Sequence, residues 1–317
     1  MTAVFLDAES LGTDIDFQPL ETAHPDWLHF PHTAPGEAGE RLRSARIAVT
    51  NKVPLKRATL ESAPKLEFIA VAATGTNNVD LDAARTLGIT VSNVRAYGTA
   101  SVVQHVFALM LSLATNLRAY HDAALRGDWG RGRHFCLLDY PIIELHGKTL
   151  GIVGHGELGK GVAQAARAFG MNVLISARPG ADDIPPGRLP LDQVLSQADV
   201  VSLHCPLTES TQNLFDGPRI ARMKPGALLI NAARGGIVNE QALADALRSG
   251  HLGGAGVDVL STEPPREGNV LLDPSLPNLI VTPHTAWASR ASRQRVIDQV
   301  GENIAAFLGG QPMRRVV

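Results

Sequence analysis

The feature that most constrains this chain is a regular alternation of short apolar runs with longer segments of helical spacing. Six such runs follow one another in the second half, at residues 149–153, 173–176, 200–203, 227–231, 255–259 and 279–282. Helical spacing fills the intervals at 158–169, 191–197 and 240–248. Runs that are apolar at nearly every position indicate strands buried on both faces. The pattern predicts an α/β domain with a parallel sheet covered by helices on both sides.

A smaller version of the same pattern occupies the start of the chain. Apolar runs at residues 4–6, 47–50, 66–72 and 89–91 predict strands, and residues 81–87 predict a helix. A chain of 317 residues has room for about two domains of roughly 150 residues each. We therefore expect a second, smaller α/β domain before the larger one.

Residues 99–118 fit neither sheet and predict one long apolar helix, followed by a polar arm rich in Gly and Arg at 126–133. The segment is either a connector between the domains or an arm for dimerisation, and the sequence leaves both readings open. Its most apolar part, 102–114, is interrupted by Gln104 and His105. That part is shorter than the roughly 20 residues that span a bilayer, so no membrane segment is expected. Residues 287–308 predict a last helix that packs on the small domain.

Composition excludes several classes of protein. The formal net charge of −2 gives no basic surface for nucleic acid and no strong field for a membrane. Two cysteines, Cys136 and Cys205, do not make a disulfide framework, which favours a reducing compartment. Residues 1–7 lack the basic and apolar segments of a signal peptide. We expect a cytoplasmic protein without a metal site.

A glycine-rich turn joins the first strand of the large domain to its helix, with the sequence GHGELG at 154–159. Gly154 permits the tight turn, Gly156 lets the backbone approach a pyrophosphate, and Gly159 lets the helix pack closely on the strand. Free amides at the helix start can then hold the phosphates. A tight turn needs glycine even without a ligand, but the position between a buried strand and a helix favours a dinucleotide.

The end of the next strand indicates which dinucleotide is bound. An acidic residue there would hold a ribose 2′-hydroxyl, yet the strand ends with Ser176, Ala177 and Arg178. A guanidinium can pair with a 2′-phosphate. The sequence therefore predicts NADP(H) in preference to NAD(H), which stays possible. The alternative for Arg178 is a solvated loop residue or one that stacks on adenine.

Three polar residues follow three late strands of the large domain. Arg234 follows 227–231, Glu263 follows 255–259, and His284 follows 279–282. Ligands of open α/β sheets bind at the carboxyl ends of the strands. Reduction of a 2-keto acid needs a proton for oxygen, which histidine supplies near neutral pH. A carboxylate would orient the imidazole and an arginine would bind the substrate carboxylate. Each residue alone has an ordinary explanation, but their joint placement favours a catalytic set.

At these residues the chain resembles the D-isomer-specific 2-hydroxyacid dehydrogenases over nearly its whole length. The resemblance rests on the segments GHGELG (154–159), HCPLTEST (204–211), NAARGG (231–236), GVDV (256–259), EP (263–264) and TPH (282–284). It implies the catalytic roles proposed for Arg234, Glu263 and His284.

The resemblance also implies a set of binding residues. Substrate would be held by Ala73, Thr74, Gly75, Arg234 and His284, with open amides of the small-domain loop facing its carboxylate. The cofactor would contact Thr74, Gly154, Gly156, Glu157, Leu158, Gly159, Ser176, Ala177, Arg178, His204, Cys205, Pro206, Thr211, Ala232, Ala233, Arg234, Asp258, His284 and Ala286.

The fold implied by the resemblance has two Rossmann-like domains, each with a doubly wound parallel sheet, and a cleft between them. The substrate domain would be discontinuous, with residues 1–97 and 286–317. The dinucleotide-binding domain would span residues 98–285 and would mediate a homodimer.

Within the family, segments 97–102, 134–136 and 284–289 are most similar to glycerate dehydrogenases, also called hydroxypyruvate reductases. Ala177 stands where NAD-using relatives carry an acidic residue, and Gln104 where many relatives carry Glu. Glu263 stands where the formate dehydrogenases carry Gln, which argues against formate. We expect NAD(P)H-dependent interconversion of a small 2-keto acid, such as glyoxylate or hydroxypyruvate, with its D-2-hydroxy acid. The alternatives are a non-catalytic NAD(P)-binding regulator and a phosphite-type dehydrogenase.

Overall fold

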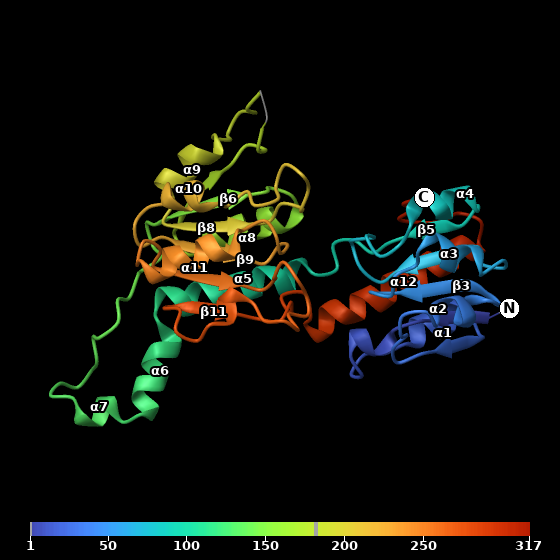
Figure 1. The fold of residues 1–317 in the computed structure, drawn as a ribbon, viewed down its shortest axis with the longest axis horizontal. Coiled ribbons are helices and arrows are strands. Elements are labelled where there is room, and N and C mark those ends of the chain that lie inside the picture. Colours follow the sequence, from blue (N-terminus) through green and yellow to red (C-terminus); the bar gives the residue numbers. More distant parts are fainter. Residues whose placement is uncertain (1, 181–182) are drawn as a thin grey trace. The chain divides into compact units, whose positions relative to one another are not determined.

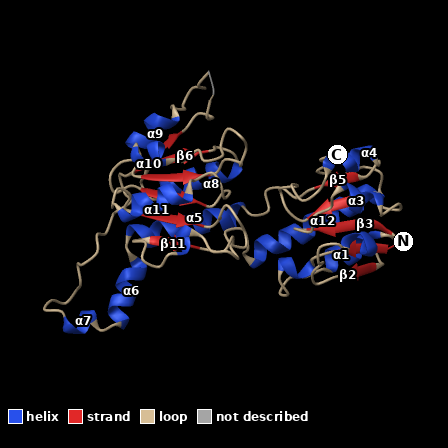
Figure 2. Ribbon diagram, in the orientation of Figure 1, coloured by secondary structure: helices blue, strands red, loops and turns tan. Residues whose placement is uncertain are grey.

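The computed structural model describes residues 2–180 and 183–317, and the chain divides into two compact units (Figure 1). Unit 1 comprises Met1–Gly98 and Ala288–Val317, and unit 2 comprises Thr99–Trp287. Each unit contains one parallel sheet flanked by helices (Figure 2). The α/β class with two parallel sheets is as the sequence predicted.

Unit 1 contains five strands in the order β2-β1-β3-β4-β5, with every neighbouring pair parallel. The strands are β1 (Thr2–Phe5), β2 (Trp27–His29), β3 (Ala45–Thr50), β4 (Phe68–Val71) and β5 (Thr90–Ser92). The helices are η1 (Ala8–Leu11), α1 (Gln18–Ala23), α2 (Ala38–Leu42), α3 (Arg57–Glu61), α4 (Leu81–Thr86) and α12 (Arg290–Leu308). Helix α12 packs on β4 and α1, as expected for the last helix, and Phe307 stacks on Phe68 with ring centroids 4.5 Å apart.

Unit 2 contains six parallel strands in the order β11-β10-β9-β8-β6-β7. The strands are β6 (Thr149–Val153), β7 (Asn172–Ile175), β8 (Val200–Leu203), β9 (Leu228–Asn231), β10 (Gly254–Val257) and β11 (Leu279–Val281). The helices are α5 (Thr99–Ala114), α6 (Leu117–Leu125), α7 (Asp128–Arg131), α8 (Glu157–Ala168), α9 (Leu191–Gln197), α10 (Gly217–Ala221), α11 (Glu240–Arg248) and η2 (Val270–Leu272). All six predicted strands are present, with some ends shifted by one or two residues.

The sheet of unit 2 is buried on both faces, which explains its continuously apolar strands. Successive residues of a strand point to opposite faces. Ile152 therefore joins the core beneath α5 and α8, while its neighbour Val153 joins the core beneath α9, α10 and α11. Both side chains are fully buried.

The long helix predicted for residues 99–118 is shorter than expected and ends at Ala114. Asn116 has a left-handed backbone with φ of 48°, which breaks the helix before α6 begins at Leu117. The expected polar arm at 126–133 contains the short helix α7. No single described helix is long and apolar enough to cross a membrane, and α5 and α6 meet that test only when joined across a bend of 59°.

Strand order places a crevice at the carboxyl ends of β6 and β8. The chain leaves β6 toward β7 on one side and resumes at β8 on the other side. Such a switch point is where open α/β sheets bind ligands. In unit 1 the switch point lies between β1 and β3, because β1 separates β2 from β3.

Candidate active site

The glycine-rich turn lies at the switch point of unit 2. A Cβ on Gly154 (φ 95°) would lie 2.5 Å from the amide of Cys205, and one on Gly159 would collide with the carbonyl of Gly154. These two glycines are needed for packing. Gly156 is different, because nothing lies within 4 Å of its Cβ position. Its bare backbone keeps open the space that a pyrophosphate needs, so the turn fits a dinucleotide.

The start of α8 provides a positive environment at this turn. Gly156 is its N-cap, and the first amides of a helix point outward with the positive end of the helix dipole. The pKa of His155 is lowered by burial and by the charges of Arg188, Lys160 and Arg167. The same three cations would favour a bound anion.

The end of β7 carries the residues expected to contact the adenosine. Ser176 and Ala177 are buried, and the Ser176 hydroxyl has no hydrogen-bond partner within the described chain. Arg178 is exposed. It lines a cavity of about 230 Å³ together with Leu191 and Arg219, among others. Asp192 also lines the cavity and pairs with Arg222. Two arginines and a strand end without an acidic residue are compatible with a phosphorylated ribose.

His204 and the turn that follows it lie at the end of β8, on the other side of the switch point from the glycine-rich turn. Burial lowers the pKa of His204 to about 4, so the ring is neutral near pH 7. Its Nε2 lies 2.9 Å from the Ser202 hydroxyl, whereas Nδ1 is buried without a partner in the described residues. The Thr211 hydroxyl accepts the Thr208 amide at 2.7 Å and donates to the Pro206 carbonyl at 2.7 Å. Thr211 thus shapes the turn itself.

The loop that carries Arg234 is folded by Asn231. The Asn231 side chain accepts the amide of Ala233 at 3.1 Å and donates to the carbonyl of Arg234 at 3.0 Å. A Cβ on Gly235 would collide with the carbonyl of Leu260, so this loop packs directly on the loop that follows β10. The exposed Arg234 guanidinium donates to the Ala233 carbonyl at 2.7 Å.

Glu263 and His284 are joined directly. Nδ1 of His284 lies 2.6 Å from Oε2 of Glu263, and Oε1 of Glu263 accepts the amide of Leu260 at 2.8 Å. The His284 side chain is 35% exposed. A carboxylate that accepts the Nδ1 proton leaves Nε2 as the nitrogen that can exchange a proton with a substrate. The pair therefore has the geometry of a general acid and its orienting carboxylate.

Asp258 lies beneath the His284 segment and is 1% exposed. Its carboxylate accepts the Thr282 hydroxyl at 2.5 Å and the amides of Thr285 and Ala286 at 2.9 Å each. The amide of His284 donates to the Asp258 carbonyl at 2.8 Å. From the sequence we expected Asp258 to contact the cofactor, and we did not predict these hydrogen bonds within the chain. They hold the segment on both sides of His284, whose backbone is left-handed with φ of 55°.

The expected substrate loop of unit 1 is held by the carbonyls of Ala73 and Thr74. The Asn93 side chain donates to the Thr74 carbonyl at 2.7 Å, and the Val94 amide donates to the Ala73 carbonyl at 3.3 Å. Among the described hydrogen bonds, none is donated by the amides of Thr74 or Gly75. Two free adjacent amides suit an anion such as a carboxylate.

The switch point of unit 1 is closed by a side chain of the protein itself. Asp7 follows β1, and its two oxygens accept the amides of Asn51 at 2.9 Å and Lys52 at 2.7 Å, after β3. Burial raises the pKa of Asp7, although the backbone hydrogen bonds act in the opposite direction. The carboxylate occupies the amides that an external anion would need there.

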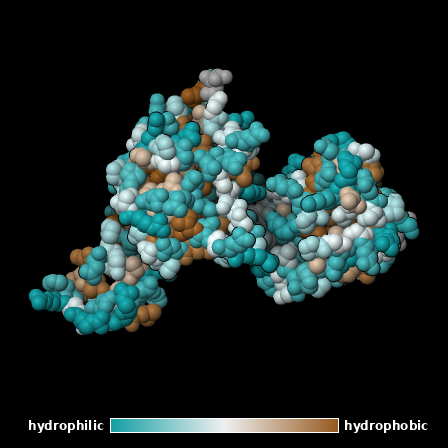
Figure 3. All heavy atoms as spheres, viewed as in Figure 1, coloured by the Kyte–Doolittle hydropathy of each residue, from teal (hydrophilic) through white to brown (hydrophobic). Residues whose placement is uncertain are grey.

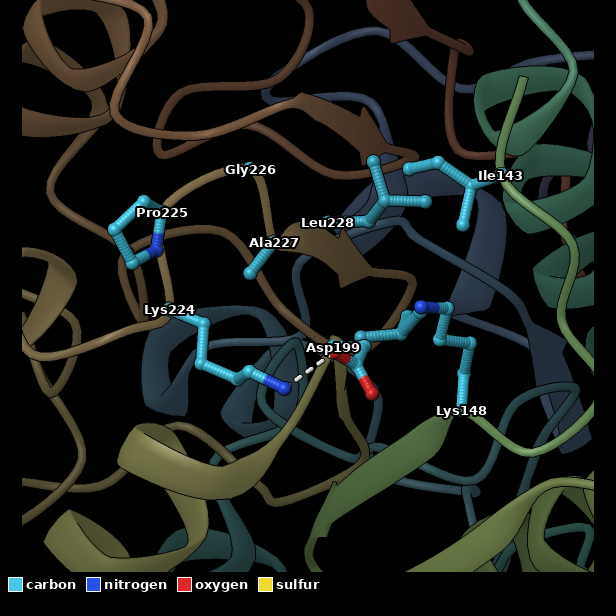
Figure 4. A pocket seen from close by; sticks show the side chains of 9 residues that line it. Ile143, Lys148, Asp199, Lys224, Pro225, Gly226, Ala227 and Leu228 are labelled. Carbon is cyan, nitrogen blue, oxygen red and sulfur yellow. Dashed lines mark hydrogen bonds and ion pairs between the residues drawn. The ribbon is translucent and has the colours of Figure 1, made fainter. Parts of the chain in front are cut away.

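A cavity of about 270 Å³ lies at the opposite edge of the unit 2 sheet (Figure 4). Its residues precede β6, β8 and β9 or begin β8 and β9, so the cavity lies at the amino ends of these strands. Lys224 lies 2.5 Å from Asp199, and Lys148 lies beside the same carboxylate (Figure 4). Asp199 also accepts the amide of Thr149 at 2.8 Å. We assign these residues a structural role in holding the amino ends of the strands. The glycine-rich turn lies at the carboxyl ends.

The structure thus brings some of the expected residues together and not others. It joins Glu263 with His284, and it packs Gly154 on His204 and Cys205. The Arg234 guanidinium is bonded to the carbonyl of Ala233 in its own loop. The side chains of Ala232 and Ala286 are buried. Their expected contacts with the cofactor would therefore come from backbone atoms.

The chain is similar in sequence to several known enzymes. Residues 107–286 match a family model described as D-isomer specific 2-hydroxyacid dehydrogenase, NAD binding domain. The chain is 46% identical over 316 residues to a glycerate dehydrogenase of Methylorubrum extorquens, covering 99% of this chain and 98% of that one. It is 39% identical over 323 residues to a hydroxypyruvate reductase of Blautia hydrogenotrophica, covering 100% and 99%.

Solved structures show the same fold. The TT0316 protein from Thermus thermophilus is 35% identical with a TM-score of 0.88, and all of both chains is covered. An acyclic imino acid reductase in complex with NADPH and D-Arg is 25% identical with a TM-score of 0.84, again over the whole of both chains.

Proposed function

The chain belongs to the D-isomer-specific 2-hydroxyacid dehydrogenases, and we propose that it interconverts a small 2-keto acid, such as glyoxylate or hydroxypyruvate, with the D-2-hydroxy acid. As a member of this family it is a nicotinamide-dependent oxidoreductase acting on keto and hydroxy acids. The observation that carries the proposal is the hydrogen bond of 2.6 Å between His284 and Glu263 at the carboxyl edge of the unit 2 sheet.

In the proposed reduction, Nε2 of His284 gives its proton to the carbonyl oxygen of the substrate. Glu263 accepts the Nδ1 proton and fixes the plane of the ring. Arg234 binds the substrate carboxylate or polarises the reacting carbonyl. The nicotinamide, when bound, supplies the hydride. In the reverse direction His284 takes the proton from the hydroxyl group.

We propose that unit 2 is the dinucleotide-binding domain, with the cofactor contacts expected from its sequence. Gly156 keeps the turn open, the amides of α8 bind the phosphates, and Arg178 binds a 2′-phosphate of NADP(H). The cavity beside Arg178 and the apolar Ala177 support this preference. NAD(H) is the alternative cofactor.

Unit 1 is proposed to be the substrate domain. The free amides of Thr74 and Gly75 would bind the substrate carboxylate. The Asn93 side chain holds the loop by its carbonyl, so the amides are fixed before substrate arrives.

We further propose that the protein forms a homodimer through unit 2. The arm from α6 to β6 exposes large apolar side chains, and apolar surface is visible on it in Figure 3. These side chains are Leu117, Leu125, Trp129, Phe135, Leu138 and Ile142, each at least 57% exposed. So many apolar groups on one segment indicate a surface that is covered by a partner.

The proposed function is tested by the loss of nicotinamide absorbance with glyoxylate, hydroxypyruvate and pyruvate, using NADPH and NADH in parallel. We expect rapid oxidation with at least one of these acids, faster with NADPH. Faster oxidation with NADH would keep the reaction and reject the cofactor preference. Tight cofactor binding with no turnover of any 2-keto acid would contradict the proposal and favour a regulator. Reduction of the oxidised cofactor by phosphite would favour a phosphite-type dehydrogenase.

A further inference from the structure

Helix α5 presents two polar side chains to the segment that carries His284. The Ser101 hydroxyl donates to the carbonyl of Ala286 at 2.7 Å. Nε2 of His105 lies 2.9 Å from the Thr282 hydroxyl and 3.4 Å from Oδ1 of Asp258. Residues four apart share one face of a helix. That face of α5 therefore contacts the segment at both of its ends.

The hydrogen-bond inventory fixes the direction of the His105 bond. The Thr282 hydroxyl has a single proton, which it donates to Oδ1 of Asp258 at 2.5 Å. The hydroxyl oxygen can then only accept, so the Nε2 of His105 must donate to it. Nε2 therefore carries a proton whether the ring is neutral or charged. Oδ1 of Asp258 lies 3.4 Å from the same nitrogen.

Asp258 depends on hydrogen-bond donors because its carboxylate is 1% exposed. A buried carboxylate that loses a donor is destabilised by its missing solvation. Within the described chain its side chain accepts from the Thr282 hydroxyl and from the amides of Thr285 and Ala286. His105 acts from outside this segment, by donating to the Thr282 hydroxyl that in turn donates to Asp258.

We propose that His105 is a positioning residue that fixes the conformation of the His284 segment through Thr282 and Asp258. The role of His284 as proton donor rests on the proposed function. The stabilisation of the His284 segment by His105 does not depend on it. The left-handed backbone at His284 is sparsely populated in residues other than glycine and needs surrounding bonds to persist. Loss of the His105 donor loosens these bonds, and His284 then spends less time in line with Glu263.

The test uses three variants of the full-length protein. His105→Leu removes the donor and keeps an apolar side chain on the helix. His105→Gln places an amide N–H within reach of the same oxygen. Gln104→Leu is the matched control, because Gln104 is the exposed neighbour of His105 on α5.

Amide hydrogen exchange of Thr285 and Ala286, followed by NMR in the ligand-free protein, reports on the segment without any turnover. We expect exchange to be about tenfold faster in His105→Leu, as for the loss of one hydrogen bond of the ordinary strength. His105→Gln should restore most of the protection, and Gln104→Leu should leave it unchanged. Unchanged exchange in His105→Leu would overturn the inference. Equal acceleration of the amides of β6 would also overturn it, because it would show a general loss of stability.

Turnover provides the second readout. His105→Leu should lower kcat several-fold, with little change in the KM for the cofactor, and His105→Gln should recover kcat. An effect on the cofactor KM alone would contradict the positioning role. If the parent enzyme reduced no 2-keto acid, the proposed function would fail, and the exchange of Thr285 and Ala286 would still decide the role of His105.

Discussion

Glu263 uses its two carboxylate oxygens for two different donors, one of which is the Nδ1 of His284 at 2.6 Å. The other oxygen accepts the Leu260 amide at 2.8 Å. The carboxylate cannot turn away from the imidazole without losing the backbone bond. The loop itself is anchored from α11, since Glu240 accepts both the amide and the hydroxyl of Ser261. Backbone geometry thus sets the orientation of the His284 ring.

Glu263→Gln tests this orientation. The Leu260 amide needs an acceptor, so the oxygen of the new amide should face it and the NH2 group should face Nδ1 of His284. The NH2 group would then donate to Nδ1 where the carboxylate accepts, so the ring loses the acceptor that orients its Nδ1 proton. We expect kcat for keto acid reduction to fall by about 100-fold. Initial rates at saturating substrate measure this, with the exposed Glu267→Gln as control. An unchanged kcat would remove Glu263 from the catalytic set.

Arg178→Ala tests the cofactor preference. Loss of a charged contact to a phosphate should weaken NADPH use by about 1 to 3 kcal/mol, while NADH use changes little. The ratio of kcat/KM for the two cofactors measures the difference. Arg248→Ala serves as control, because Arg248 is exposed on α11 and pairs with Asp245 and Asp273 instead. Equal losses with both cofactors would argue against a phosphate contact.

His204 predicts a dependence of stability on pH. Burial lowers its pKa from 6.5 to about 4, so the folded protein binds this proton less readily than the unfolded chain. The contribution of neutral His204 to the free energy of unfolding is fully present above about pH 6.5 and is lost as the pH falls to about 4. Between about pH 7 and pH 5 the loss amounts to about 2 kcal/mol.

Urea unfolding of the parent and of His204→Gln at these two pH values measures the effect. The variant should lose about 2 kcal/mol less of its free energy of unfolding over this interval than the parent does. His32→Gln, at an exposed position of unit 1, should behave like the parent. The same pH dependence in all three proteins would show that His204 does not titrate as proposed.

Phe135→Asp tests the dimer. Phe135 is 90% exposed on the arm, so a charge there should leave the fold intact and oppose burial against a second copy. Light scattering after gel filtration should give a dimer for the parent and a monomer for the variant. Leu87→Asp, on the surface of unit 1 at 42% exposure, should stay dimeric. A monomeric parent, or a variant that remains a dimer, would refute the proposed interface.

The large sheet was predictable because burial on both faces leaves a continuous apolar signature. Strands such as β6 and β8 have the bounds that their apolar runs indicate. Strand β2 was missed because it is a three-residue edge strand with little burial and no such signature. The break after Ala114 was missed because it depends on the left-handed backbone at Asn116, which the apolar pattern does not encode.

The site was predictable to the extent that strand ends determine it. Glu263 and His284 follow the adjacent strands β10 and β11, so their meeting follows from the strand order. The bonds of Asp258 could not be predicted, because they depend on the local path of the chain after β11. A signal was nevertheless present in the sequence. Ser101 and His105 are polar residues four apart on a mostly apolar helix, a spacing that indicates a shared polar contact.

His284 is the proposed proton donor in keto acid reduction. Its most direct test is kcat for His284→Ala with the best 2-keto acid, measured together with the cofactor dissociation constant by fluorescence quenching. We expect kcat to fall by about 100-fold to 10,000-fold while cofactor affinity stays near that of the parent. A variant that keeps full activity would contradict the claim.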